Sequence, residues 1–284
     1  MQTAIITDST CDLPQALLAE HTIYVVPQYV IWGDEELNDL TDITAEIFFE
    51  RLQTDPVAPK TSRPTPQDFL TLIEQARQAG AEEIVTILVS DKLSGSVGSA
   101  RIVQQEVDIP FHIVDSKAVS AALGFQVLAA ARARAQGADT QGIITAAEEA
   151  RRTMRMFFTV DTLDYLHRGG RIGAAQRWIG TALNIKPALY VDIEKGEVAP
   201  GERTRTRKRA IEHLYQSFFE GIPSGSTLHV AVVHAVVDDE AQALAERIRT
   251  EHNPAELLVT SITPAIGVHA GPGVLGVGGF YTQG

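Results

Sequence analysis

Hydrophobic and polar residues follow one another along the first half of the chain as short apolar runs separated by longer amphipathic stretches. The apolar, β-branched runs predict four strand regions: Ala4–Thr7, Ile23–Ile31 with a break at Pro27, Ile84–Val89 and Phe111–Val114. The amphipathic stretches predict helices over Thr44–Gln53, Thr65–Gln78, Ser94–Gln105 and Lys117–Gln136, with Thr65 as N-cap and Pro66 in the first turn. This order is typical of repeated βα units, so we expect a mainly parallel sheet with helices on both faces.

The second half of the chain predicts a mixed α/β arrangement. A long helix over Ala138–Arg155 is expected to bridge two α/β domains, which places the boundary near residue 155 and predicts domains over 1–155 and 156–284. Strands are predicted over Phe157–Val160, Leu228–Val237, Glu256–Ile262 and Val274–Phe280, and a hairpin over Pro187–Ile193 and Glu197–Thr204. Helices are predicted over Trp178–Leu183, Thr206–Phe219 and Asp239–Glu251.

Composition narrows the class of protein. The formal net charge of -12 argues against broad nucleic-acid binding and against electrostatic adhesion to anionic lipid, since both need a basic face. The apolar run Ala118–Ala131 is too short and too polar to span a bilayer. Met1–Asp8 has the pattern of a strand rather than a signal peptide, and Cys11 is the only cysteine, so we expect a cytoplasmic protein without an intrachain disulfide.

Paired glycines between two arginines form the first candidate site. Gly169 and Gly170 follow a predicted strand and short helix, and Arg168 and Arg171 flank them. Glycine lets backbone approach a ligand closely, and the Arg171 guanidinium can fork onto a carboxylate or phosphate. The alternative is a helix C-cap followed by a solvated arginine.

Two further turns are rich in hydroxyl groups. Thr61 and Ser62 precede a predicted helix, and Ser94 and Gly95 follow the strand Ile84–Val89 at a turn where backbone N–H groups favour an anion. The second turn is not a P-loop, because no Gly-Lys-Ser/Thr follows, and it lacks the glycines of a nucleophile elbow. For the turn that contains Thr61 and Ser62, a capping loop is the alternative.

Three other stretches carry weaker signals. Asp8 and Ser9 end the first predicted strand, where we favour a structural or supporting role. Gly267–Gly276 matches the dinucleotide fingerprint only formally, because no acidic residue follows at the required distance, and its glycines are expected to form a tight loop that brings His269 to a site. Arg203–Arg209 holds five cations in seven residues, with Arg205 and Arg209 on one helix face if the helix begins early enough. A solvated face is the alternative for these cations, and no pattern predicts a metal site.

Together, and in this order, these stretches resemble the DegV family of bacterial fatty-acid-binding proteins. The matching segments span nearly the whole chain: Thr7–Pro14, Lys60–Pro66, Leu93–Ala100, Asp115–Ser116, Phe158–Pro187 and His269–Gly276. The strongest match is Leu166–Gly173 followed by Leu183–Pro187. The chain departs from the family pattern at Arg63, where glutamine is common, at Asp91–Lys92 and at Ser96–Val97.

The resemblance implies a function as well as a fold. It implies two α/β domains with a long-chain fatty acid between them, whose carboxylate is held by hydroxyls matching Thr61 and Ser94, with Ser62 and Gly95 in the same turns. It also implies that Arg171 and His269 lie near the head group and take part in work with a kinase partner. That partner is the ATP-binding subunit of a fatty-acid kinase, and the product is an acyl phosphate.

We therefore expect a lipid-carrying protein rather than an enzyme, with no catalytic residues, no metal and no cofactor. The ligand is expected to be a C14–C18 fatty acid such as palmitate, with its tail in an apolar tunnel of the second domain. The surface around Arg171, Arg203, Arg205, Arg209 and His269 is expected to face the partner, and lipid exchange is expected to involve transient membrane contact.

Two alternatives remain at this point. A hydrolase or acyl transferase would use Ser94 as nucleophile and His269 as base, although no third triad member is evident. A nucleotide-binding or regulatory module would use the cations of Arg203–Arg209.

Overall fold

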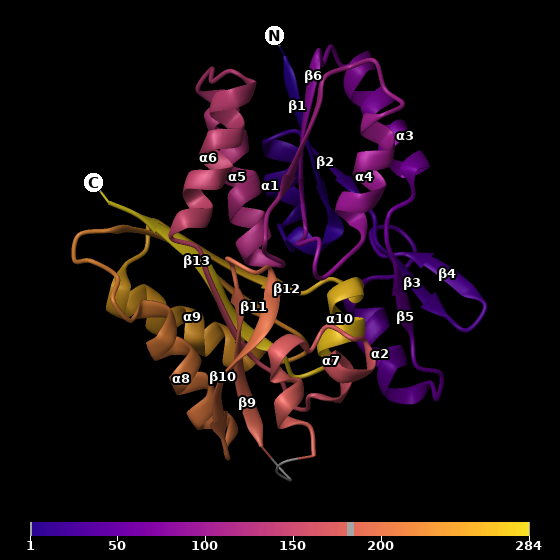
Figure 1. Ribbon diagram of the computed structural model, residues 1–284. Coiled ribbons are helices and arrows are strands. Elements are labelled where there is room, and N and C mark those ends of the chain that lie inside the picture. Colours follow the sequence, from indigo (N-terminus) through magenta and orange to yellow (C-terminus); the bar gives the residue numbers. More distant parts are fainter. Residues whose placement is uncertain (1, 181–184, 284) are drawn as a thin grey trace.

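The computed structural model describes residues 2–180 and 185–283, which fold into an upper and a lower lobe (Figure 1). The upper lobe, called here the parallel lobe, contains a four-stranded sheet in the order β2-β1-β6-β7 with all strands parallel. Its strands are β1 (Thr3–Asp8), β2 (Ile23–Val26), β6 (Glu83–Leu88) and β7 (Phe111–Asp115). Because the strands are parallel, their carboxyl ends meet at one edge, which faces the lower lobe (Figure 1).

Helices cover both faces of the parallel sheet, as the alternation of strands and helices predicts. The helices of this lobe are α1 (Gln15–Glu20), α3 (Pro66–Gln78), α4 (Ser96–Gln104), α5 (Ala121–Ala135) and α6 (Thr140–Arg152). Successive strand residues point to opposite faces, so Ile6 packs in one cluster with α3 and α4, and Ile5 packs in another with α5 and α6. The start of α3 follows from a capping box between Thr65 and Asp68, with Pro66 in the first turn.

The lower lobe, called here the mixed lobe, is built on a six-stranded sheet in the order β10-β9-β8-β13-β11-β12. Its strands are β8 (Arg155–Thr159), β9 (Lys186–Asp192), β10 (Glu197–Thr204), β11 (Thr227–His234), β12 (Glu256–Ser261) and β13 (Leu275–Thr282). Only β11 and β12 pair in parallel. Helices α8 (Arg207–Phe219) and α9 (Asp238–His252) cover one face, and α5 of the parallel lobe packs against the other. The two lobes therefore share one helix as part of their cores.

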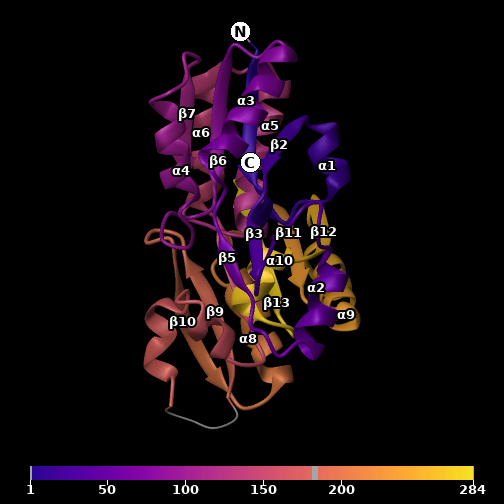
Figure 2. The same ribbon diagram turned by 90° about the vertical axis from the view of Figure 1, so that its right-hand side faces the viewer.

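A segment from the first quarter of the chain leaves the parallel lobe and packs on the mixed lobe. It is called here the bridging segment, residues 29–62, and contains β3 (Tyr29–Trp32), β4 (Glu35–Asn38), α2 (Ala45–Thr54) and β5 (Lys60–Ser62). Its strands form an antiparallel sheet in the order β4-β3-β5. Both views place this segment beside α10 (Pro264–Ala270) (Figures 1 and 2), and α10 also contacts α7 (Asp164–Arg168). An added Cβ at Gly267 would stand 2.6 Å from the Phe48 ring, so glycine allows α10 to pack closely on α2.

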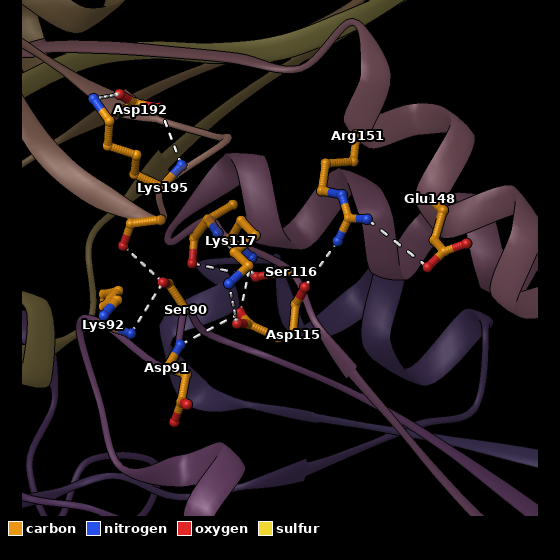
Figure 3. Close-up of polar contacts among 12 residues, drawn as sticks. Ser90, Asp91, Lys92, Asp115, Ser116, Lys117, Glu148, Arg151, Asp192 and Lys195 are labelled. Atoms are coloured by element: carbon orange, nitrogen blue, oxygen red, sulfur yellow. Dashed lines mark hydrogen bonds and ion pairs between the residues drawn. The ribbon is translucent and has the colours of Figure 1, made fainter.

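The lobes also meet at the tip of the β9–β10 hairpin. The Ser90 hydroxyl donates to the Gly196 carbonyl oxygen at 2.7 Å, and Gly196 has a left-handed φ of 74°. A Cβ at Gly196 would lie 2.2 Å from the Ser90 hydroxyl, so only glycine fits this contact. Figure 3 shows Ser90 between Asp192 and Lys195 of the hairpin and Asp115 and Lys117 of the parallel lobe. The hairpin thus rests on the carboxyl edge of the parallel sheet.

Several predicted elements differ from the observed ones. The region Ile23–Ile31 is two strands in different sheets, because the chain turns at Pro27 and Gln28 into the bridging segment. The predicted helix Ala138–Arg155 is only α6, and the helix predicted from Lys117 begins at Ala121, because Lys117 and Ser120 have positive φ. The helix predicted over Trp178–Leu183 is wrong where it can be compared: a 3₁₀ helix, η2 (Gly173–Trp178), ends there and Ile179 is extended, while 181–183 lie outside the described residues. The division at residue 155 stays a prediction.

Candidate functional site

A cavity of about 350 Å³ lies between the lobes, and both lobes and the bridging segment line it. All six predicted ligand-binding residues line this cavity: Thr61, Ser62, Ser94, Gly95, Arg171 and His269. Most of the remaining lining is apolar, contributed by residues that include Met156, Phe158, Val191, Val233, Ile262 and Val274. The cavity therefore combines a polar end with an apolar body.

His269 and Thr61 meet at the polar end. His269 lies in the last turn of α10, not in the tight loop that the sequence predicts, and its Nε2 atom is 2.8 Å from the Thr61 hydroxyl oxygen. Burial, with a smaller effect of the Arg171 charge, lowers the pKa of His269 to about 4. The ring is therefore neutral at pH 7, and its buried Nδ1 atom has no hydrogen-bond partner among residues 2–180 and 185–283.

The paired glycines Gly169 and Gly170 leave room for the His269 ring and direct the chain toward Arg171. A Cβ on Gly169 would stand 2.1 Å from the Nδ1 atom of His269, so the ring packs against bare backbone. Gly170 has a left-handed φ of 69° and turns the chain toward Arg171. Arg171 then donates from Nε to the Leu93 carbonyl oxygen at 2.9 Å and from a terminal nitrogen to the Gly169 carbonyl oxygen at 2.7 Å. These bonds hold the guanidinium of the mixed lobe beside the Ser94 turn of the parallel lobe.

Ser94 is held by a small network that the sequence analysis did not find. Ser94 precedes α4, with Gly95 as its N-cap residue, and its hydroxyl oxygen lies 2.9 Å from that of Ser96 and 3.4 Å from Gln28 Oε1. The Gln28 side-chain amide also donates to the Ser96 hydroxyl at 2.8 Å, and both residues are buried. Gln28 lies in the turn between β2 and β3, where a lone polar residue carries no motif.

Ser62 and Arg63 lie at the mouth of the cavity, where both are exposed. A Cβ on Gly95 would be 2.6 Å from the Arg63 side chain, so Arg63 lies directly over the Ser94–Gly95 turn. The departure from the family pattern at Arg63 therefore adds a cation beside the polar end.

Three buried carboxyl groups stand behind the polar end, outside the cavity lining. Asp8 accepts hydrogen bonds from Thr10 and from the Val89 amide, which supports the interpretation of this segment as structural. Asp12 accepts from the Ser120 hydroxyl and from the Thr263 amide. Asp39 accepts a hydrogen bond from the Ser9 hydroxyl at 2.8 Å and one from the backbone amide of Gln28 at 3.0 Å. Burial raises the pKa of Asp8, and it raises the pKa of Asp12 and of Asp39 to about 7 each.

The cations of the basic stretch Arg203–Arg209 differ in their exposure and in their contacts. Helix α8 begins at Arg207, so Arg205 precedes the helix, and the early start that would place Arg205 and Arg209 on one helix face is not observed. Arg203, Arg205 and Arg209 are exposed, and Arg203 also stacks on Trp178 at 5.2 Å. Arg207 is only partly exposed and pairs with Glu240 at 2.7 Å. Only part of this stretch is therefore free to meet a partner.

Within residues 2–180 and 185–283, no group of three or more His, Cys, Asp or Glu side chains could hold a metal ion. Burial raises the pKa of the Cys11 thiol. None of the helices described for this chain has the length and apolar character needed to cross a bilayer.

The hydrolase alternative requires a contact between Ser94 and His269, and the geometry does not favour it. The Ser94 hydroxyl is engaged by Ser96 and Gln28, and the Nε2 atom of His269 faces Thr61. No carboxylate in the described part of the chain orients the Nδ1 atom of His269, as a triad requires.

Comparison with known proteins agrees with this geometry. The family model described as "Uncharacterised protein, DegV family" matches residues 2–282. The chain belongs to the DegV family. A DegV domain-containing protein of Streptomyces coelicolor is 40% identical over 276 residues, covering 96% of each chain.

Solved structures support the same assignment. The structure of a DegV family protein from Thermus thermophilus, described as showing fatty acid binding, matches with a TM-score of 0.91 at 32% identity, covering 99% of this chain and 100% of the other. The Streptococcus pneumoniae fatty acid kinase (Fak) B3 protein, solved with linoleic acid, matches with a TM-score of 0.84 over 99% of both chains. Its identity is 21%, so it shares the fold alone. The predicted arrangement of a parallel α/β lobe and a mixed α/β lobe is confirmed.

Proposed function

We propose that this protein binds one long-chain fatty acid in the cavity between its lobes and acts as a carrier rather than as an enzyme. The observation that carries the proposal is the single cavity that joins an apolar body to a polar end containing Thr61, Ser94, Arg171 and His269. A relative of the same family, from Thermus thermophilus, is described as binding fatty acid. The expected ligand is a C14–C18 acid such as palmitate.

The tail and the head group contribute differently to binding. Burial of each methylene contributes about 0.8 kcal/mol, so roughly fifteen methylenes contribute about 12 kcal/mol before the costs of association and ordering. A hydrogen bond to the carboxylate contributes about 1.5–3 kcal/mol before those costs. The tail therefore sets the affinity, and the head-group contacts set the orientation.

The polar end suits a carboxylate that must stay accessible. Thr61 and Ser94 would donate hydroxyl hydrogen bonds, and the Arg171 guanidinium would supply the positive charge that His269 lacks at neutral pH. Arg171 is held by backbone carbonyl groups on both sides of the cavity, so its position does not depend on the ligand. A prearranged head-group site of this kind lowers the entropy cost of orienting the ligand.

The second part of the proposal is that the bound carboxylate is presented to the ATP-binding subunit of a fatty-acid kinase, which converts it to an acyl phosphate. Support comes from the motif around Arg171 and from the exposed cations Arg203, Arg205 and Arg209, which fit an acidic partner surface. Lipid exchange would involve transient contact with a membrane, and the expected location is the cytoplasm. An assay of lipid phosphorylation by such a subunit, with the loaded protein as substrate, would test this part. We expect Arg203→Glu to reduce the rate of phosphorylation.

Mass spectrometry of an organic extract from the purified protein tests the lipid proposal directly. We expect about one C14–C18 fatty acid per chain, because the cavity between the lobes joins one apolar body to one polar end. A Ser226→Ala variant, changed at a partly exposed serine that does not line the cavity, should carry the same lipid. Protein that contains no fatty acid, and that takes none up from added palmitate, would refute the proposal.

A further inference from the structure

The first turn of α10 lacks the cap that a helix normally takes from its own chain. Thr263 precedes the helix but makes no side-chain capping bond, and Pro264 has no amide hydrogen. The Thr263 amide instead donates to Asp12 at 2.8 Å, and the Ala265 amide interacts with the Asp39 carboxylate and favours its ionised form. Two carboxylates from other parts of the fold thus replace the missing cap.

Those two carboxylates do not belong to the mixed lobe. Asp12 follows η1 (Ser9–Cys11), directly after β1 of the parallel lobe, and Asp39 follows β4 in the bridging segment. Asp12 is also tied to Ser120, which lines the cavity at the start of α5. Both carboxylates are buried, at 4% exposure each, so their bonds are shielded from water.

The two carboxylates connect both sides of the polar end. Asp39 accepts from the Gln28 amide, and the side chain of Gln28 contacts both Ser94 and Ser96. On the other side, α10 is a single short helix that begins next to Asp12 and Asp39 and carries His269 in its last turn. The distance along the helix from Pro264 to His269 is only about 7.5 Å at 1.5 Å per residue, so a shift at the first turn moves His269 directly.

We propose that Asp12 and Asp39 are positioning residues: by capping α10 from across the lobe boundary, they fix His269 relative to Thr61 and Ser94. This inference rests on the proposed function, because it concerns how the carboxylate of a fatty acid is recognised. Neither carboxylate lines the cavity, so their effect on the ligand is indirect.

Head-group recognition can be measured apart from tail burial. Dissociation constants for palmitate and for its methyl ester share the tail contribution, so their ratio reports the polar end alone. We expect Asp12→Ala and Asp39→Ala to reduce the preference for the acid by about tenfold, which corresponds to 1.4 kcal/mol. Asp12→Asn keeps an acceptor for the Thr263 amide and should retain most of the preference. Asp42→Ala, changed at an exposed carboxylate in the same bridging segment, serves as the control.

The outcomes separate this inference from the proposed function. A wild-type protein that binds neither palmitate nor its ester refutes the proposed function and the inference with it. A wild-type protein that prefers the acid, with folded alanine variants that prefer it equally, overturns the inference alone. If the alanine variants do not fold, Asp12→Asn decides: a folded Asn variant without the preference contradicts the inference. Retention of the preference, together with an unchanged His269 ring signal in the NMR spectrum, supports it.

Discussion

The Nε2 atom of His269 lies 2.8 Å from the hydroxyl oxygen of Thr61, although 208 residues separate the two in the chain. The bridging segment makes this contact, because it carries β5 out of the parallel lobe and lays it beside α10. The polar end of the cavity is therefore shared by distant parts of the chain, and it depends on how they pack.

The pKa of His269 provides a first test. Burial and the nearby Arg171 charge lower this pKa to about 4, so the ring should stay neutral in titrations from pH 8 down to about 5. Two-dimensional NMR of the histidine ring protons would follow it. Replacement of Arg171 by Gln should raise the pKa only modestly, because burial is the larger cause. A His269 ring that titrates near 6.5 in the wild-type protein would contradict the described burial.

A pair of adjacent glycines offers a second test with an internal control. Gly169→Ala places a methyl group 2.1 Å from the Nδ1 atom of His269, so the ring must leave its present position at a cost of about 1–3 kcal/mol. Gly170→Ala meets nothing within 4 Å but has φ of 69°, so it should cost about 1–2 kcal/mol through backbone strain alone. Urea unfolding would measure both costs. Only Gly169→Ala should change the chemical shifts of His269, and equal shifts in the two variants would argue against this contact.

The sequence predicts much of this architecture because its signals are local. Hydrophobic periodicity and the capping residues Thr44, Thr65 and Thr206 mark helices that the structure contains, and each of these three residues caps its helix. Six residues that line the cavity are predicted from short motifs, because glycine and hydroxyl turns keep a recognisable order along the chain.

The remaining features depend on contacts between distant segments. Pro27 indicates a break, but nothing local shows that the chain then moves to another lobe. Gln28 and Asp39 have no motif, since their roles arise only when the bridging segment packs beside α10. The sequence does not distinguish Arg207 from its exposed neighbours for the same reason, although Arg207 forms an ion pair with Glu240 in the folded protein.

Loss of a protein hydroxyl that contacts the lipid head group should affect the orientation of the bound fatty acid more than its affinity. Ser94→Ala and Thr61→Val each remove one donor, so each should weaken palmitate binding by only about tenfold. Isothermal titration calorimetry of delipidated protein would measure this loss. Phosphorylation per bound lipid by a fatty-acid kinase subunit should fall further than binding does. A large loss of lipid with undiminished phosphorylation per bound lipid would reverse the proposed division between tail and head group.

The buried carboxyl groups predict an unusual dependence of stability on pH. Burial raises the pKa of Asp12 and of Asp39 from 3.8 to about 7, so between these values the folded chain holds protons that the unfolded chain has released. The free energy of unfolding should therefore rise as the pH falls from about 7 toward 4, by up to about 1.4 kcal/mol per pH unit for each group.

His269 has the opposite effect on the free energy of unfolding over part of this pH range. Its pKa falls from 6.5 in the unfolded chain to about 4 in the folded one, so its contribution to stability is lost as the pH drops below 6.5. Substitution separates the two effects, because Asp12→Asn and Asp39→Asn imitate the protonated carboxyl at every pH. Each Asn variant should be most stabilised relative to wild type at pH 8 and least at pH 4, measured by urea unfolding at several pH values. An Asn variant whose stability follows the wild-type pH profile in parallel would show that the carboxyl group it replaces titrates near its ordinary pKa in the folded chain.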